Sequence, residues 1–144
     1  MFSKACEYGI KAVVYIASES LDDKRVKIGD IANYSGSPEA FTAKVLGKLT
    51  KAGIISSYKG PNGGFELDKA KMKKVKLSEI VSIIDGDSIY NGCALGLSEC
   101  DECNPCPMHE GFVTIRDELK SMLKGTSIYD LATEYKAGNS TLIR

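Results

Sequence analysis

The most chemically distinctive stretch of the sequence is residues 93–109, CALGLSECDECNPCPMH, called the cysteine loop below. Four of the five cysteines lie in it, and the only histidine, His109, ends it. Cys-x-x-Cys spacings let two thiolates reach one metal from a turn, and both zinc sites and iron–sulfur clusters use them. Thiolates also select these metals over hard cations. The cysteine loop therefore predicts a metal centre. Its possible ligands are Cys93, Cys100, Cys103, Cys106 and His109.

The residues alone leave the kind of centre open. Cys100, Cys103, Cys106 and His109 would make a closed tetrahedral zinc site of purely structural use. An iron–sulfur cluster or a metal-free thiol switch would instead respond to redox conditions. An electron carrier is disfavoured, because the cysteine spacing of a ferredoxin is incomplete. We expect no enzyme, because the only histidine lies among the cysteines and no nucleophile and base pair is apparent.

Charge is distributed unevenly along a chain whose net charge is zero. Residues 1–76 contain 14 basic and 8 acidic residues, a net charge of +6, and residues 77–144 contain 5 and 11, a net charge of −6. A basic half is suited to approach phosphates. No apolar run approaches the roughly 20 residues of a membrane span, and the charged first segment is a poor signal peptide. We therefore expect a cytoplasmic protein without membrane contact, with reduced thiols.

Three helices and a hairpin are predicted in the first 76 residues. Apolar residues at helical spacing place the helices at 3–19, 28–36 and 38–52. Ser37 can cap the third helix, with Pro38 at its first position. Short strand-like runs at 54–58 and 65–67 flank the turn KGPNGG. Residues 1–76 therefore predict a winged helix-turn-helix domain, in which the second helix of the motif enters the major groove of double-stranded DNA.

Helix 38–52 has the surface expected of a recognition helix. Small residues opposite its apolar side would let it approach a groove, and lysines at its edges can meet phosphates. A protein-interaction module is the alternative, because a fold does not fix a function. The list of possible base contacts is poor in Arg, Asn and Gln, so the operator is not predicted. The expected DNA-contacting residues of this region are Ser37, Glu39, Ala40, Thr42, Ala43, Lys44 and Lys48.

The second half, residues 77–144, is predicted to contain the cysteine loop between helices. The helices are expected at 77–86, 107–124 and 127–137. The long helix repeats apolar residues at three and four positions, a heptad-like seam that favours a homodimer. The seam residues are Phe112, Ile115, Leu119 and Met122. The expected fold is thus mainly α with a small β-wing, formed by a winged helix-turn-helix domain plus a long dimerisation helix.

The wing sequence GPNGGF, a cysteine loop ending in CPMH and the long helix after it together resemble the Rrf-type regulators, the family of IscR and NsrR. The resemblance covers about residues 4–131. It implies a dimeric bacterial transcription regulator, which in many members carries an iron–sulfur cluster. Matching residue by residue makes Cys93, Cys100 and Cys106 the three cysteine ligands. Cys103 departs from the family pattern and is a fourth ligand, a replacement ligand or a redox spare.

The resemblance leaves two choices for the fourth ligand. His109 matches the histidine used by some members, whereas Glu7 stands where others use an acid from the first helix of the partner subunit. The first choice favours a 2Fe–2S cluster and the second a 4Fe–4S cluster. In the wing, the resemblance implies DNA contacts from Lys59, Pro61 and Asn62. Relatives often have Arg before the GP of the wing, and Lys59 keeps the charge without the planar fork that suits a narrow minor groove.

Overall fold

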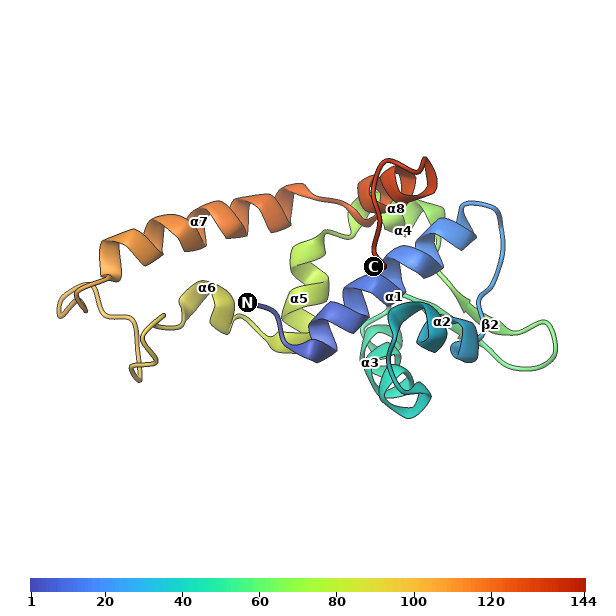
Figure 1. Cartoon of the computed structure of the whole chain (residues 1–144), viewed down its shortest axis with the longest axis horizontal. Coiled ribbons are helices and arrows are strands. Elements are labelled where there is room, and N and C mark those ends of the chain that lie inside the picture. The colour runs from blue at the N-terminus through green and yellow to red at the C-terminus, as the bar shows by residue number, and fades with distance from the viewer.

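The amino-terminal half forms the predicted helix-turn-helix and hairpin (Figure 1). A computed structural model describes the whole chain, residues 1–144. The element order in this half is α1 (Lys4–Ser20), α2 (Ile28–Ser35), α3 (Glu39–Lys51), β1 (Ser56–Tyr58) and β2 (Gly64–Glu66). Both strands pair antiparallel, with Ser57 opposite Phe65. The predicted fold class, mainly α with a small β-wing, is confirmed.

Helix α1 is the central element of the fold. The Ser3 hydroxyl accepts a hydrogen bond from the Cys6 backbone N–H at 3.1 Å and so caps its start. Its apolar side chains, such as Val13 and Ile16, are fully buried. Helices α2, α3, α5 and α8 all pack against α1. This one helix therefore connects the DNA-binding half to the elements that hold the cysteine loop.

The start of α3 differs from the expectation. The helix begins at Glu39 after Pro38, and no side chain caps it. Ser37 does not cap the helix, because its buried hydroxyl is hydrogen-bonded to the Thr42 hydroxyl instead. This bond ties the turn between α2 and α3 to the first turn of α3. It therefore helps to set the angle between α2 and α3.

The strands of the hairpin are shorter than the predicted runs because the residues at their outer ends are buried in the core and hydrogen-bonded to helices. Ile54 is buried, and its backbone N–H donates to the Leu49 carbonyl at the end of α3. At the other end, the Leu67 N–H donates to the Ser20 hydroxyl of α1 at 3.0 Å. Backbone groups used in this way cannot continue the ladder. The hairpin is thus attached at its base to both α1 and α3.

Gly64 is required where the hairpin passes the segment before α2. Its φ is +133°, and an added Cβ would lie 2.7 Å from the Val26 carbonyl oxygen. We expect Gly64→Ala to lower the free energy of unfolding by about 2 to 3 kcal/mol, measured by urea denaturation. Gly47→Ala is the matched control, since Gly47 lies within α3 with no atom within 4 Å of an added Cβ. It should stabilise by about 0.5 to 1 kcal/mol. Equal effects of the two changes would contradict the close approach.

Five helices follow the wing. They are α4 (Lys69–Lys74), α5 (Leu77–Asp85), α6 (Ser88–Asn91), α7 (His109–Gly125) and α8 (Ile128–Lys136). The sequence analysis predicted α5, α7 and α8 but missed α4 and α6. Ile80 of α5 and Ile128 and Ala132 of α8 belong to the same buried cluster as the apolar residues of α1 and α3. The core of the first half therefore continues past residue 76.

Helix α7 leaves the body of the molecule as an arm, with the cysteine loop at its far end (Figure 1). Leu123, near the base of the arm, is fully buried against Cys6 and Val81. Farther along, Ile115 and Met122 are each 55% exposed. The apolar seam of α7 is thus only partly covered within one chain. No helix in the structure has the length and apolar character needed to cross a membrane.

Candidate metal centre and nucleic-acid interface

The cysteine loop joins α6 to α7 and arranges its ligand candidates as two pairs. The Cys100 Sγ lies 3.4 Å from the His109 Nδ1, and the Cys106 thiol is close enough to Cys93 to lower its pKa. These four side chains are half-buried, whereas Cys103 is exposed. No three His, Cys, Asp or Glu side chains converge closely enough to hold a metal ion as they stand. The pairing separates Cys103 from the other four candidates.

Cys93 is surrounded by groups that favour its thiolate. Hydrogen bonds from the backbone of Leu97 and Leu95 lower the pKa of Cys93 below its ordinary value, and the Cys106 thiol adds to this effect. The thiolate is the form of cysteine that binds metals. The turn that follows Cys93 therefore prepares this residue to act as a ligand.

Arg116 of α7 is part of the site and was missed by the sequence analysis. Its Nη2 donates to the Cys100 Sγ at 3.2 Å, and its Nη1 donates to the Gly92 carbonyl at 2.6 Å. Its Nε is buried and has no partner. Arg116 follows His109 by seven residues, so both lie on one side of α7. That spacing is the signal that could have found it.

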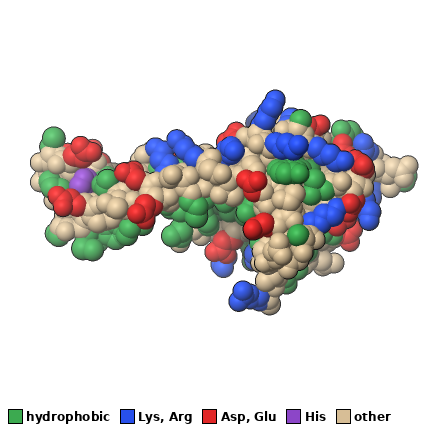
Figure 2. Space-filling view, turned by 90° about the horizontal axis from the view of Figure 1, so that it is seen from above, with side chains coloured by type: hydrophobic (Ala, Val, Ile, Leu, Met, Phe, Trp, Pro, Cys, Tyr) green, Lys and Arg blue, Asp and Glu red, His purple; other side chains and the backbone are tan.

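The residues of the loop fit a cluster by their chemistry. Three half-buried thiols and one imidazole supply the soft ligands that iron–sulfur clusters use. The Arg116 guanidinium supplies positive charge and one free buried N–H beside them, which suits a negatively charged group bound by thiolates. In Figure 2, acidic side chains lie around the tip of the arm, while Lys and Arg side chains gather over the body.

Glu7, the other candidate for the fourth ligand, contacts no residue of the cysteine loop of its own chain through a hydrogen bond. It lies on α1 and forms an ion pair with Lys4 at 2.9 Å. The Lys4 ammonium lowers the pKa of the Glu7 carboxyl, so Glu7 is ionised at neutral pH. A role as ligand would therefore require the cysteine loop of a second copy of the chain.

Cys6 is isolated from the other four cysteines. It is fully buried, and this burial, with the Asp85 carboxylate nearby, raises the pKa of Cys6 to about 12. We expect iodoacetamide to modify four of the five cysteines of the metal-free native protein at pH 8, and the fifth only after denaturation. Mass spectrometry of the peptides checks this result. Rapid modification of Cys6 in the native protein would contradict the packing of α1 on α7.

The predicted DNA contacts on α3 divide into exposed and buried residues. Five are exposed: Glu39, Ala40, Ala43, Lys44 and Lys48. Ser37 and Thr42 are buried and bonded to each other, so they shape the turn before α3 rather than its outer surface. The outer surface of α3 therefore carries small side chains in its middle and lysines at its edge. Such a surface can approach a groove lined by phosphates closely.

Two basic residues before α2 hold the wing in place. The Lys27 Nζ donates to the carbonyls of Gly60 and Pro61, at 3.0 and 3.1 Å. Arg25 lies 3.7 Å from the centre of the Tyr58 ring and donates to the Asn62 carbonyl at 3.3 Å. The sequence analysis missed both residues, which lie more than 30 positions before their partners. The wing residues Lys59, Pro61 and Asn62 remain exposed.

An exposed recognition helix with small and basic residues, followed by a braced wing, defines the winged-helix class of DNA-binding proteins. The chain belongs to the Rrf2 family, since the family model, described as an iron-dependent transcriptional regulator, matches residues 2–134. The predicted family resemblance is thus confirmed. The relatives are transcription regulators and not enzymes, as the sequence indicated.

Relatives known by sequence agree with this membership. A protein of Aquifex aeolicus that carries the name of an HTH-type transcriptional regulator is 34% identical, over 91% of this chain and 90% of its own. The regulator IscR of Aliivibrio salmonicida is 24% identical over 88% and 74% of the two chains.

Among solved structures, the global cysteine regulator CymR of B. subtilis matches 92% of this chain and 96% of its own, with a TM-score of 0.74 and 22% identity. The IscR of T. potens matches 98% of this chain and 92% of its own, with a TM-score of 0.72 and 16% identity. These two likenesses concern the fold.

Proposed function

We propose that this transcription regulator binds DNA as a homodimer and that an iron–sulfur cluster in the cysteine loop switches this binding. The observation that carries the proposal is the set of half-buried Cys93, Cys100, Cys106 and His109, with the Arg116 guanidinium on Cys100. A bound cluster would supply a redox-sensitive group of variable charge. The identity of the fourth ligand, His109 or Glu7 of the partner subunit, belongs to the same proposal.

The residues around the loop suggest how its state reaches the DNA. Cys93 follows α6 by two residues, and α6 packs on α7. Helix α5, which precedes α6, contacts α3. Reordering the loop would therefore move groups that rest on the recognition helix, which is a two-state element biased by a local ligand. The exposed Ile115 and Met122 on α7 support a homodimer, in which a second recognition helix would meet a second half-site.

The proposed DNA contacts are those exposed on α3 and on the wing. They are Glu39, Ala40, Ala43, Lys44, Lys48, Lys59, Pro61 and Asn62. The lysines would meet phosphates, and the small residues would let α3 lie deep in the major groove. Lys27 and Arg25 act as positioning residues, because they hold the carbonyl groups of the wing turn.

The first experiment is anaerobic purification of the full chain, followed by a visible spectrum and assays of iron, sulfide and zinc on one sample. We expect a brown protein with iron and sulfide in near-equal amounts. The iron count separates a two-iron from a four-iron cluster. A colourless protein with about one zinc per chain would show that the loop holds a structural zinc ion and not a cluster. A metal-free protein that resists reconstitution would leave a thiol-based switch.

A further inference from the structure

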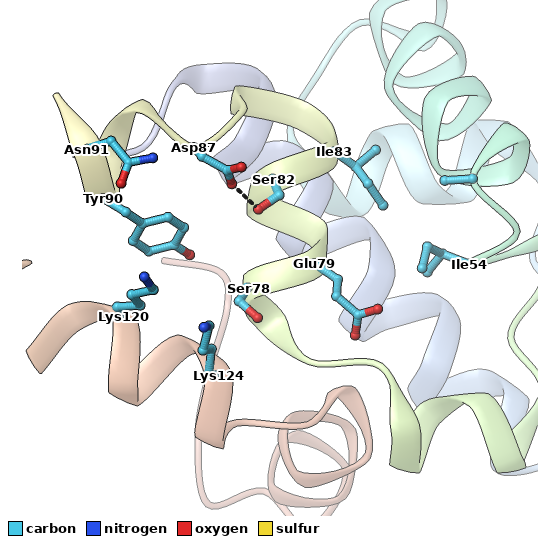
Figure 3. A pocket seen from close by; sticks show the side chains of 11 residues that line it. Ile54, Ser78, Glu79, Ser82, Ile83, Asp87, Tyr90, Asn91, Lys120 and Lys124 are labelled. Atoms are coloured by element: carbon cyan, nitrogen blue, oxygen red, sulfur yellow. Dashed lines mark hydrogen bonds between the residues drawn. The ribbon is translucent and has the colours of Figure 1, made fainter. Parts of the chain in front are cut away.

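A groove between α5, α6 and α7 lies outside both the cysteine loop and the DNA-contacting surface (Figure 3). Its volume is about 500 Å³, which is in the range of sites for small organic molecules. Its walls come from distant parts of the chain: Ile54 follows the recognition helix, Ile83 belongs to α5, and Tyr90 belongs to α6. We call it the α5–α7 groove.

Three hydrogen-bond donors meet in the α5–α7 groove without partners. The Tyr90 hydroxyl is buried and makes no hydrogen bond. Burial raises the pKa of Tyr90, so the hydroxyl keeps its proton near neutral pH. The ammonium groups of Lys120 and Lys124 also line the groove, and neither forms an ion pair. Figure 3 shows the ends of these three side chains directed toward the same space.

The two carboxylates of the groove form no ion pair with these lysines. Glu79 accepts a hydrogen bond from the Lys76 backbone N–H at 2.7 Å, as part of the cap of α5. Asp87 accepts from the Ser82 hydroxyl at 2.5 Å. Both acids keep their negative charge, but each is held by a neighbouring donor and neither pairs with a lysine of the groove. The Tyr90 hydroxyl and the two ammonium groups are thus left without acceptors, and the carboxylate of a ligand placed between them would accept from all three.

The opposite wall of the groove is apolar. Ala52, Ile54 and Ile83 line it, and Ile54 is buried in the core. An inorganic anion would leave this wall wetted, whereas an aliphatic or aromatic body attached to the anion would cover it. The groove therefore combines one charged end with one apolar wall, the usual composition of a site for a small organic acid.

The groove would stay open in the proposed homodimer. Lys120 and Lys124 each lie two residues from Met122, and two residues turn an α-helix by about 200°. The lysines therefore point to the side of α7 opposite the exposed apolar seam that contains Met122. A partner helix on the seam would leave the groove accessible.

From these observations we infer that the α5–α7 groove binds a small organic monocarboxylate with an aliphatic or aromatic body. The carboxylate accepts hydrogen bonds from Tyr90, Lys120 and Lys124, and the body covers Ile54 and Ile83. Such a ligand contacts the segment that ends the recognition helix and the base of the arm that holds the cysteine loop. Binding does not depend on the presence of a cluster.

The test is a saturation-transfer NMR titration of the full chain with benzoate, with benzyl alcohol and with inorganic sulfate as competitor. Benzoate should bind saturably, benzyl alcohol should bind at least about tenfold more weakly, and sulfate should displace benzoate only at much higher concentration. Equal binding of benzyl alcohol would overturn the role of the charge. Displacement by sulfate at equal concentration would overturn the role of the apolar wall.

Substitutions in the groove test whether benzoate binds there. Lys120→Gln with Lys124→Gln should weaken benzoate binding at least about tenfold, and Tyr90→Phe should weaken it several-fold while keeping the ring. Lys74→Gln, an exposed lysine of α4 outside the groove, is the control and should change nothing. Unchanged binding in the double variant, with normal thermal unfolding, would overturn the inference. These outcomes are independent of iron content and of DNA binding, so they leave the proposed function to its own test.

Discussion

The Cys93→Ser variant is expected to lose the iron–sulfur cluster, whereas the Cys103→Ser variant is expected to keep it. The two cysteines separate the two ligand sets, because Cys93 belongs only to the proposed cluster set and Cys103 only to the zinc set. Serine is nearly isosteric with cysteine, but its hard oxygen is a poor ligand for these metals. In the structure, Cys93 is half-buried, whereas Cys103 is exposed.

The measurement is iron, sulfide and zinc per chain, with the visible spectrum, for both variants and the unchanged protein prepared side by side without oxygen. Cys93→Ser should contain little iron or sulfide, and Cys103→Ser should match the unchanged protein. Each variant loses one thiol, so each is the control of the other for general damage. The reverse pattern, with zinc lost only in Cys103→Ser, would favour the structural zinc site of Cys100, Cys103, Cys106 and His109.

The helices of the first half could be predicted because the apolar residues that recur at helical spacing are the residues that the core buries. Ile31, Leu46 and Leu49, for example, recur at helical spacing in the sequence and are fully buried. Helix α4 could not be predicted in this way, since KAKMKK holds a single buried side chain, Met72. It forms because Asp68 caps it, accepting from the Ala70 and Lys71 N–H groups. A cap of this kind gives a weak signal in a lysine-rich segment.

The site was predictable where one segment holds the chemistry and not where distant segments meet. The density and spacing of the cysteines in the cysteine loop are enough to indicate its candidate ligands. Arg116, by contrast, reaches Cys100 across 16 positions, and Lys27 reaches the wing carbonyls across more than 30. Only the packing of α7 and of the hairpin brings these groups together. The burial of Ser37 and Thr42 is a similar case, because it depends on the angle between α2 and α3.

The second prediction of large effect concerns the basic side of the DNA-binding half. Replacing Lys44, Lys48 and Lys59 together by glutamine is expected to weaken non-specific binding to duplex DNA by about a hundredfold at about 0.15 M salt. All three lysines are exposed, two on α3 and one on the wing. Each phosphate contact contributes about 0.9 to the slope of log affinity against log salt, so the slope should fall by about 2.7. Fluorescence anisotropy over a salt series measures both quantities without knowledge of the operator.

A matched change on α4 separates phosphate contacts from net charge. Replacing Lys69, Lys73 and Lys74 by glutamine removes the same three charges, but α4 packs on the side of α1 away from α3 (Figure 1). Lys71 is left unchanged because its Nζ donates to the Gly53 carbonyl just after α3 at 2.8 Å. A general field effect would lower the affinity equally in both triple variants, and such a result would contradict a specific DNA-binding surface. A loss of slope confined to the α3 and wing variant would instead count the phosphates that these lysines contact, because only released counterions change the slope. The reverse result would assign DNA binding to the α4 side and leave the small outer surface of α3 without a role.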